Sequence, residues 1–154
     1  MRLKNYQNQT LKDLEDYIKV LNESSSLSAA FQNYWELCHG VSVNKLDNTY
    51  LRPYCNTITG IPRVTLKVPT AGGKTFIACN AMKRIFETLQ IGDYPKVVTW
   101  FVPSDTILQQ TLNKLRDVSH PYRQTIDFLF NHQVIVVDKE SALLGNGLKH
   151  EQLQ

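Results

Sequence analysis

A glycine pair followed by lysine and threonine carries the clearest chemistry in this sequence. It lies in the stretch Val68-Pro69-Thr70-Ala71-Gly72-Gly73-Lys74-Thr75, directly after a β-branched run. Glycines let backbone N–H groups approach an anion closely, the lysine can reach the β- and γ-phosphates, and the threonine hydroxyl can complete a Mg²⁺ shell. The pattern therefore predicts a loop that binds a nucleoside triphosphate. The alternative interpretation is a glycine-rich turn with a solvated lysine.

Such a loop needs a strand before it and a helix after it. Residues 61–68 are rich in β-branched side chains and predict a buried strand. Residues 75–89 carry a wide apolar stripe with polar residues on the remaining face, which predicts a helix packed on a sheet. The start of that helix would add unpaired N–H donors and the positive end of its dipole.

The rest of the chain predicts helices before the loop and alternating elements after it. Residues 10–22 and 27–38 have helical periodicity, with serines between them as a break and cap. Residues 96–102 predict a second strand, residues 105–118 a helix capped by Ser104, and residues 133–137 a third strand. We expect His120-Pro121 to end the unit that contains this helix, while residues 126–130 are ambiguous between helix and strand. The alternation predicts an α/β fold with a parallel sheet.

Three segments together resemble a known family. The stretch from Val68 to Thr75 resembles motif I of superfamily 2 (DEAD/DEAH-type) helicases, with Ala71 where those proteins usually have glycine. Tyr50-Leu51-Arg52-Pro53-Tyr54 resembles the Leu-Arg-Pro-Tyr-Gln segment of the res subunit of type III restriction enzymes, with Cys55 in place of the glutamine. Val97-Val98-Thr99-Trp100-Phe101-Val102-Pro103-Ser104 resembles motif Ia. The similarity covers residues 50–145.

The resemblance implies a fold, an activity and partners. It implies a partial RecA-like P-loop domain over residues 49–154, preceded by an N-terminal helical segment over residues 1–48. It implies ATP and Mg²⁺ as cofactors, DNA as a partner, and a modification-methylase subunit as a further partner. The implied activity is ATP-dependent helicase or translocase motion along DNA. No Asp of this chain is followed by Glu, the pair that the family uses in motif II, so we expect an N-terminal fragment with little catalysis of its own.

The candidate site residues follow from the loop and from the resemblance. Lys74 and Thr75 are the candidate catalytic residues, and Thr75 is also the candidate Mg²⁺ ligand. Asp138 is a second metal candidate, with a place near motif Ib as the alternative. Ser104 could contact a DNA phosphate or only cap its helix. The candidate residues for binding ATP are Pro69, Thr70, Ala71, Gly72, Gly73, Lys74, Thr75 and Arg52, the last of which could stack on adenine or only fix the path of the chain.

Two other functions remain open at this stage. One is a small P-loop kinase, and the other is a non-catalytic interaction module that binds nucleotide for stability. The net charge of +3 permits contact with nucleic acid without arguing for it. The start of the chain lacks a signal peptide pattern and no apolar run approaches eighteen residues, so we expect a cytoplasmic protein that does not span a membrane.

Overall fold

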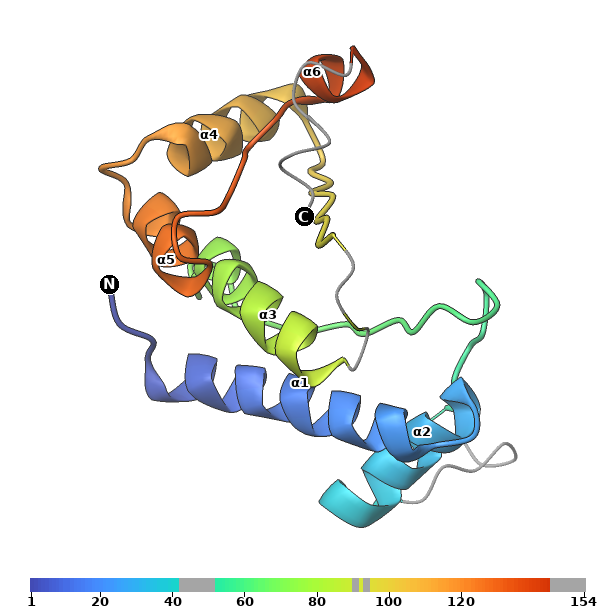
Figure 1. Ribbon diagram of the computed structural model, residues 1–154. Coiled ribbons are helices and arrows are strands. Elements are labelled where there is room, and N and C mark those ends of the chain that lie inside the picture. Colours follow the sequence, from blue (N-terminus) through green and yellow to red (C-terminus); the bar gives the residue numbers. More distant parts are fainter. Residues whose placement is uncertain (42–51, 90–91, 93–94, 145–154) are drawn as a thin grey trace.

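Helices make up the regular secondary structure that the structure describes. The computed structural model describes residues 1–41, 52–89, 92 and 95–144. Helix α3 packs against α1 and against α5, and so lies at the centre of this arrangement (Figure 1). Within the described ranges the elements are α1 Asn5–Glu23, α2 Leu27–Asn33, the π-helix η1 Tyr34–Cys38, α3 Lys74–Thr88, α4 Asp105–Arg116, α5 Pro121–Leu129 and α6 Lys139–Leu143.

The predicted α/β fold with a parallel sheet is wrong. Residues 61–68, 96–102 and 133–137, whose composition predicts strands, form no strand in the described structure. Some of their apolar side chains meet solvent, as Val97 (66% exposed) and Ile135 (49% exposed) illustrate, while others are half-buried against the helices. β-branched residues fit a pleated, half-buried surface, but a strand forms only where a neighbouring segment pairs with its N–H and C=O groups. Such pairing is missing among the described residues, so the RecA-like sheet is not formed there.

The predicted helices are confirmed, with shifts at their ends and with the π-helix η1 in the second part of the predicted helix 27–38. Helix α1 begins at Asn5, five residues before the predicted start. The predicted caps are also confirmed: the Ser26 side chain accepts from the N–H of Ala29, and the Ser104 side chain accepts from the N–H of Ile107. Each cap satisfies one of the N–H groups that a helix start leaves without a partner.

Helix α5 corrects one prediction. His120-Pro121 does not end a unit but begins this helix, because proline suits the first helical position, where no backbone donor is needed. His120 is the N-cap, and its Nδ1 atom accepts a hydrogen bond from the N–H of Tyr122. The ambiguous residues 126–130 therefore fall in the last turn and C-cap of α5.

A first hydrophobic cluster joins α1 to α3. Leu11 (fully buried), Leu14 and Ile18 of α1 pack with Ile77 and Ala81 of α3. These residues follow the helical spacing that places apolar side chains on one face. The amphipathic stripe of α1 is thus buried against the helix that follows the glycine pair, and this contact fixes α1 relative to the loop.

Polar contacts hold the far end of the same helix pair. Arg84 of α3 donates to Glu15 of α1 at 2.9 Å, and Asn22 of α1 donates to the backbone oxygen of Thr88 at 2.6 Å. The hydrogen bonds to Glu15 from Lys19 and Arg84 lower the pKa of its carboxyl group, Lys19 having the larger effect. The two helices are therefore joined along their length and not only at their apolar stripe.

A second cluster lies on the other side of α3. Cys79 (fully buried), Leu115 of α4 and Ile126 of α5 form its buried centre, with Trp100 and Phe130 packed against it. Burial raises the pKa of the Cys79 thiol to about 11. Helix α3 is therefore apolar on two faces, which accounts for the wide stripe predicted from its sequence.

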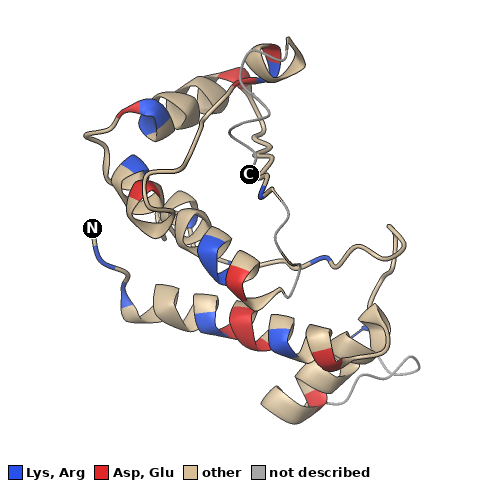
Figure 2. Cartoon of the chain, viewed as in Figure 1, with Lys and Arg blue, Asp and Glu red and all other residues tan. Residues whose placement is uncertain are grey.

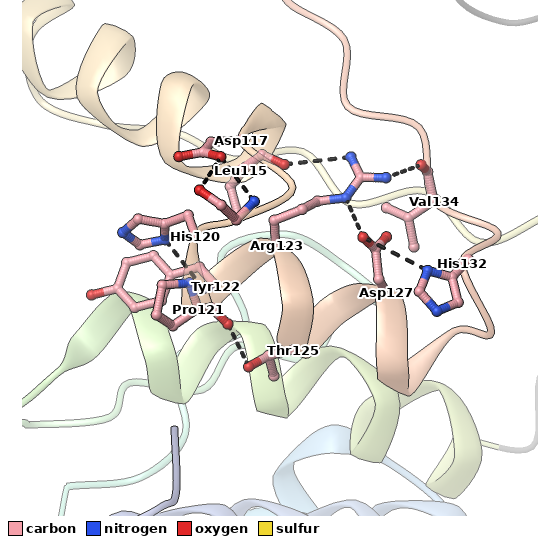
Figure 3. A network of polar contacts seen from close by, with 11 residues as sticks. Leu115, Asp117, His120, Pro121, Tyr122, Arg123, Thr125, Asp127, His132 and Val134 are labelled. Atoms are coloured by element: carbon pink, nitrogen blue, oxygen red, sulfur yellow. Dashed lines mark hydrogen bonds and ion pairs between the residues drawn. The ribbon is translucent and has the colours of Figure 1, made fainter.

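A largely covered arginine connects α4, α5 and the chain that follows them (Figure 3). Arg123 donates from Nε to Oδ2 of Asp127 at 2.8 Å, from Nη1 to the oxygen of Leu115 at 3.4 Å and from Nη2 to the oxygen of Val134 at 3.1 Å. The side chains of Arg123 and Asp127 are only 16% and 9% exposed. One side chain thus ties together three separate segments.

We find no helix in the described ranges that combines the length and the apolar character needed to cross a membrane.

Candidate phosphate-binding site

The glycine pair forms a tight loop that leads directly into α3. The N–H of Gly72 donates to the oxygen of Pro69 at 3.0 Å, which closes the turn. Gly73 is the N-cap of α3 at φ 72° and ψ 39°, in the left-handed region that favours glycine. It provides no side-chain cap, so the first N–H groups of α3 keep no partner from the cap. A helix start of this kind is suited to bind an anion.

The loop has no room for side chains at its two glycines. A Cβ added at Gly72 would lie 2.8 Å from the oxygen of Pro69 and 2.7 Å from Cγ1 of Val68. A Cβ added at Gly73 would lie 2.7 Å from Nε2 of Gln7. Ala71 also has a positive φ of 60°, a conformation that costs a non-glycine residue roughly 1–2 kcal/mol. Glycine would adopt this conformation without strain.

Lys74 and Thr75 occupy the first turn of α3. Lys74 is exposed, and its Nζ atom donates to the oxygen of Pro69 at 3.1 Å, so the ammonium group lies across the mouth of the loop. Thr75 is half-buried beside it. The structure therefore brings together the seven candidate residues from Pro69 to Thr75 in one turn. Their roles toward a nucleotide remain predictions.

Two residues that the sequence reasoning missed also reach this loop. The hydroxyl of Tyr6 donates to the oxygen of Gly72 at 2.8 Å, and Nε2 of Gln7 donates to the same oxygen at 3.0 Å. Gln7 is 3% exposed, and its Oε1 atom accepts from the N–H of Lys4 at 2.9 Å. The start of α1 therefore fixes the loop through two hydrogen bonds to the backbone oxygen of Gly72.

A sequence signal for these residues was present. Leu3-Lys4-Asn5-Tyr6-Gln7 keeps the Tyr-Gln pair of the Leu-Arg-Pro-Tyr-Gln segment, whereas the stretch from Leu51 has Tyr54 followed by Cys55. The later stretch keeps the Arg-Pro pair instead. The buried glutamine on the loop favours the earlier one.

Arg52 lies in a segment whose neighbours contact other parts of the chain. It is exposed, and the ring of Tyr54 packs against Phe31 of α2 with 5.8 Å between ring centroids. The Tyr54 hydroxyl accepts from the N–H of Arg63 at 2.9 Å. These contacts fix the path of the chain near α2, and a role for Arg52 at adenine remains a prediction.

Asp138 is engaged at the start of α6. Its Oδ1 atom accepts from the N–H of Ser141 at 2.7 Å, and its Oδ2 atom accepts from Nη2 of Arg116 at 3.0 Å. These contacts, with Ser141 the larger cause, lower the pKa of Asp138 from 3.8 to about 2. Its described partners thus lie on α4 and α6, and none is a loop residue. A role as Mg²⁺ ligand remains a prediction.

Asp138 is expected to make the free energy of unfolding depend on pH in the acidic range. Because its folded pKa lies below the unfolded value, its contribution is present above about pH 4 and is lost as the pH falls toward 2. Replacement of Asp138 by Asn should therefore flatten the fall of the thermal midpoint over this interval. Melting curves at several pH values check this. Asp105→Asn on α4 is the control, and an equal effect of both substitutions would contradict the prediction.

Ser104 uses its hydroxyl oxygen as the cap of α4, at 3.4 Å from the N–H of Ile107. Ser104 itself is exposed. Contact with a DNA phosphate remains a prediction for this residue.

Charged residues do not single out a surface for nucleic acid. Figure 2 shows Lys and Arg spread over the helices and interspersed with Asp and Glu. Helix α1 illustrates this, since Lys19 pairs with Glu15 at 2.8 Å and with Asp16 at 3.6 Å. Groups of three or more potential metal ligands among His, Cys, Asp and Glu are also missing from the described residues.

Substitution of Gly73 tests how tightly the loop is built. Gly73→Ala combines a left-handed φ with a clash against Gln7, whereas Gly60→Ala has a similar φ of +78° and open space around the new Cβ. The Gly60 variant should lose roughly 1–2 kcal/mol of unfolding free energy, and the Gly73 variant should lose more because Gln7 must also move. Denaturant titration of both proteins measures the difference. Equal losses would contradict the contact between Gln7 and the loop.

A known family matches most of the chain. The family model described as "Type III restriction enzyme, res subunit" matches residues 1–146. Neither a curated protein nor a solved structure matches this chain. The match includes Tyr6 and Gln7 as well as the segment that begins at residue 50.

Proposed function

This chain belongs to the family of the type III restriction enzyme res subunit, whose common part is a helicase-like ATP-binding domain, and we propose that its loop 69–75 binds the triphosphate of ATP. The observation that carries the proposal is the geometry at Gly73. A left-handed, uncapped glycine starts α3, and the ammonium group of Lys74 lies over the same turn. Backbone N–H groups and one cation thus converge on a place where a phosphate can bind.

The residues of the loop fit a triphosphate better than they fit any neutral ligand. Lys74 donates to the Pro69 oxygen, a neutral acceptor, and a phosphate oxygen would compete well for it because charged pairs form stronger hydrogen bonds. The positive end of the α3 dipole would favour the same charge. Lys74 would therefore hold the β- and γ-phosphates, and the N–H groups at the start of α3 would surround them.

Mg²⁺ would be held mainly by the nucleotide. This ion commonly takes phosphate oxygens and waters with only one or two protein ligands. Thr75 is in the position to supply one hydroxyl ligand. Bound Mg²⁺ would neutralise charge on the β- and γ-phosphates while the γ-phosphoryl group is transferred to water and ADP leaves.

Gln7 is our candidate for reading the adenine base. Its carboxamide uses one of two hydrogens on Nε2 and one of two lone pairs on Oε1, so each atom keeps the capacity for one further hydrogen bond. Because Gln7 is 3% exposed, pairing with a base would require its side chain to turn outward. A glutamine can pair with N6 and N7 of adenine through this combination. In the type III segment the glutamine after tyrosine has this role, and here the glutamine after tyrosine is Gln7.

We further propose that this chain is the ATP-binding portion of a type III restriction enzyme. The complete motor would use ATP hydrolysis to move along DNA. Association with a modification-methylase subunit belongs to the same proposal. The family match supports this reading, and the loop geometry supports its first step. The candidate for the carboxylate on Mg²⁺ is Asp138, whose described hydrogen bonds go to Arg116 and Ser141.

Binding and turnover assays test the proposal. We expect the purified chain to bind a non-hydrolysable ATP analogue in the presence of Mg²⁺, as measured by calorimetry, and to turn over ATP slowly with or without duplex DNA. Absence of binding would refute it. Phosphate transfer to an acceptor without DNA would indicate a P-loop kinase. Rapid DNA-stimulated turnover would confirm the motor while contradicting the expected lack of catalysis.

A further inference from the structure

We propose that Tyr6 is a positioning residue whose hydroxyl orients the Gly72–Gly73 peptide group for phosphate binding. The Tyr6 hydroxyl donates to the oxygen of Gly72 at 2.8 Å across 66 residues of sequence. This inference rests on the proposed binding of a triphosphate by the loop. It concerns the orientation of one N–H donor and not the identity of the nucleotide.

The geometry of the peptide bond carries the argument. The oxygen of Gly72 and the N–H of Gly73 belong to one planar trans peptide group, so they point in opposite directions. When Tyr6 and Gln7 hold the oxygen on the side of α1, the N–H of Gly73 faces away from α1. The residues on the outer side of the loop, from Pro69 to Ala71, are exposed. The N–H is thus directed to where a phosphate can arrive.

A peptide between two glycines needs such an external constraint. Neither glycine has a Cβ to restrict rotation, and glycine adopts positive and negative φ about equally well. Without a fixed oxygen, this peptide group could turn and present its oxygen to the phosphate. Tyr6 and Gln7 together occupy both lone pairs of the oxygen, and the buried stripe of α1 holds these two donors in place.

Tyr6 allows a cleaner test than Gln7. The Gln7 carboxamide also accepts from the N–H of Lys4, so its replacement would alter the start of α1. The hydroxyl of Tyr6 makes a single hydrogen bond among the described residues, and the residue is 42% exposed. Tyr6→Phe therefore removes the contact with Gly72 and little packing.

The experiment compares inorganic tripolyphosphate with ATP, both with Mg²⁺, by calorimetry. The loss of one hydrogen bond that orients a donor is expected to weaken binding by about 3- to 10-fold. We expect the same factor for both ligands, because the effect lies at the phosphates. Tyr17→Phe is the matched control: it lies on the same helix, its hydroxyl is buried, and it has no hydrogen-bond partner among the described residues.

The outcomes separate this inference from the proposed function. A wild-type chain that binds neither ligand refutes the proposed function and the inference with it. Wild-type binding that Tyr6→Phe leaves unchanged refutes the inference alone. Wild-type binding of ATP without tripolyphosphate, or a loss confined to ATP, would place the effect at the nucleoside and also refute it. Unchanged thermal midpoints in Tyr6→Phe would exclude general destabilisation as the cause of weaker binding.

Discussion

Lys74→Ala is expected to reduce the affinity for ATP on the order of 100-fold or more. The substitution removes the single Lys or Arg side chain within residues 69–75 and leaves the turn itself intact. Lys74 is exposed, and its described hydrogen bond goes only to the Pro69 oxygen within the same loop. The fold should therefore survive. Calorimetric titration with a non-hydrolysable ATP analogue and Mg²⁺ measures the effect, and circular dichroism checks the helices.

The matched control for this substitution is Lys83→Ala on the same helix. Lys83 pairs with Glu87 at 3.4 Å in the ordinary spacing of a helical ion pair, away from the loop. Its removal should leave ATP affinity within about twofold of wild type. Equal losses from both substitutions would mean that ATP binding reflects overall charge. Undiminished binding by Lys74→Ala would place the nucleotide elsewhere on the chain.

Asp127→Ala is expected to lower the free energy of unfolding by about 3–5 kcal/mol. The substitution leaves the guanidinium of Arg123, which is only 16% exposed, without its carboxylate partner, and an unpaired charge with little access to water is costly. Because Arg123 also donates to the oxygens of Leu115 and Val134, its displacement would loosen α4 and the chain after α5. Denaturant titration followed by circular dichroism measures the change.

A second Arg–Asp pair provides the comparison. Arg116 and Asp138 are 3.0 Å apart, close to the 2.8 Å of the first pair, but their side chains are 42% and 35% exposed. Asp138→Ala should cost far less than Asp127→Ala, because water can replace the lost partner. A double variant, Arg123→Met with Asp127→Leu, should recover much of the stability lost by Asp127→Ala. Similar losses at the two pairs would show that burial is not what makes the first one important.

The helices of this chain could be predicted from its sequence because their signals are local. Apolar spacing located α1 and α3, and Ser104 marked the start of α4 through its own hydroxyl. His120-Pro121 was misread because proline is compatible with a helix start as well as with a helix end. A distinction between the two needs the residues that follow, and those were ambiguous.

The strand predictions were wrong because strand formation depends on a pairing partner, which the sequence of one segment does not reveal. A β-branched run such as residues 96–102 states only that a pleated, half-buried position would suit it. Whether a partner segment lies alongside depends on the rest of the fold. In the described structure Phe101 is 88% exposed, and no described segment pairs with residues 96–102 to form a sheet.

The contiguous residues of the candidate site were predicted from the sequence. Its residues that are distant in the sequence were not predicted. The residues from Pro69 to Thr75 are contiguous, so one local pattern locates them all. Tyr6 and Gln7 lie more than sixty positions away and reach the loop only because α1 packs on α3. Their contacts require tertiary structure, although their Tyr-Gln pair was a signal that could have been read.

The two apolar faces of α3 have a consequence for cooperativity. Neither hydrophobic cluster can melt alone, because each shares this helix with the other. The amide protons in the middle of α3 should therefore exchange with solvent only through global opening, and more slowly than those of α6. The loop before α3 is held by the same helix. A substitution that removes the packing of Ile126 would therefore destabilise the loop as well, because it destabilises α3.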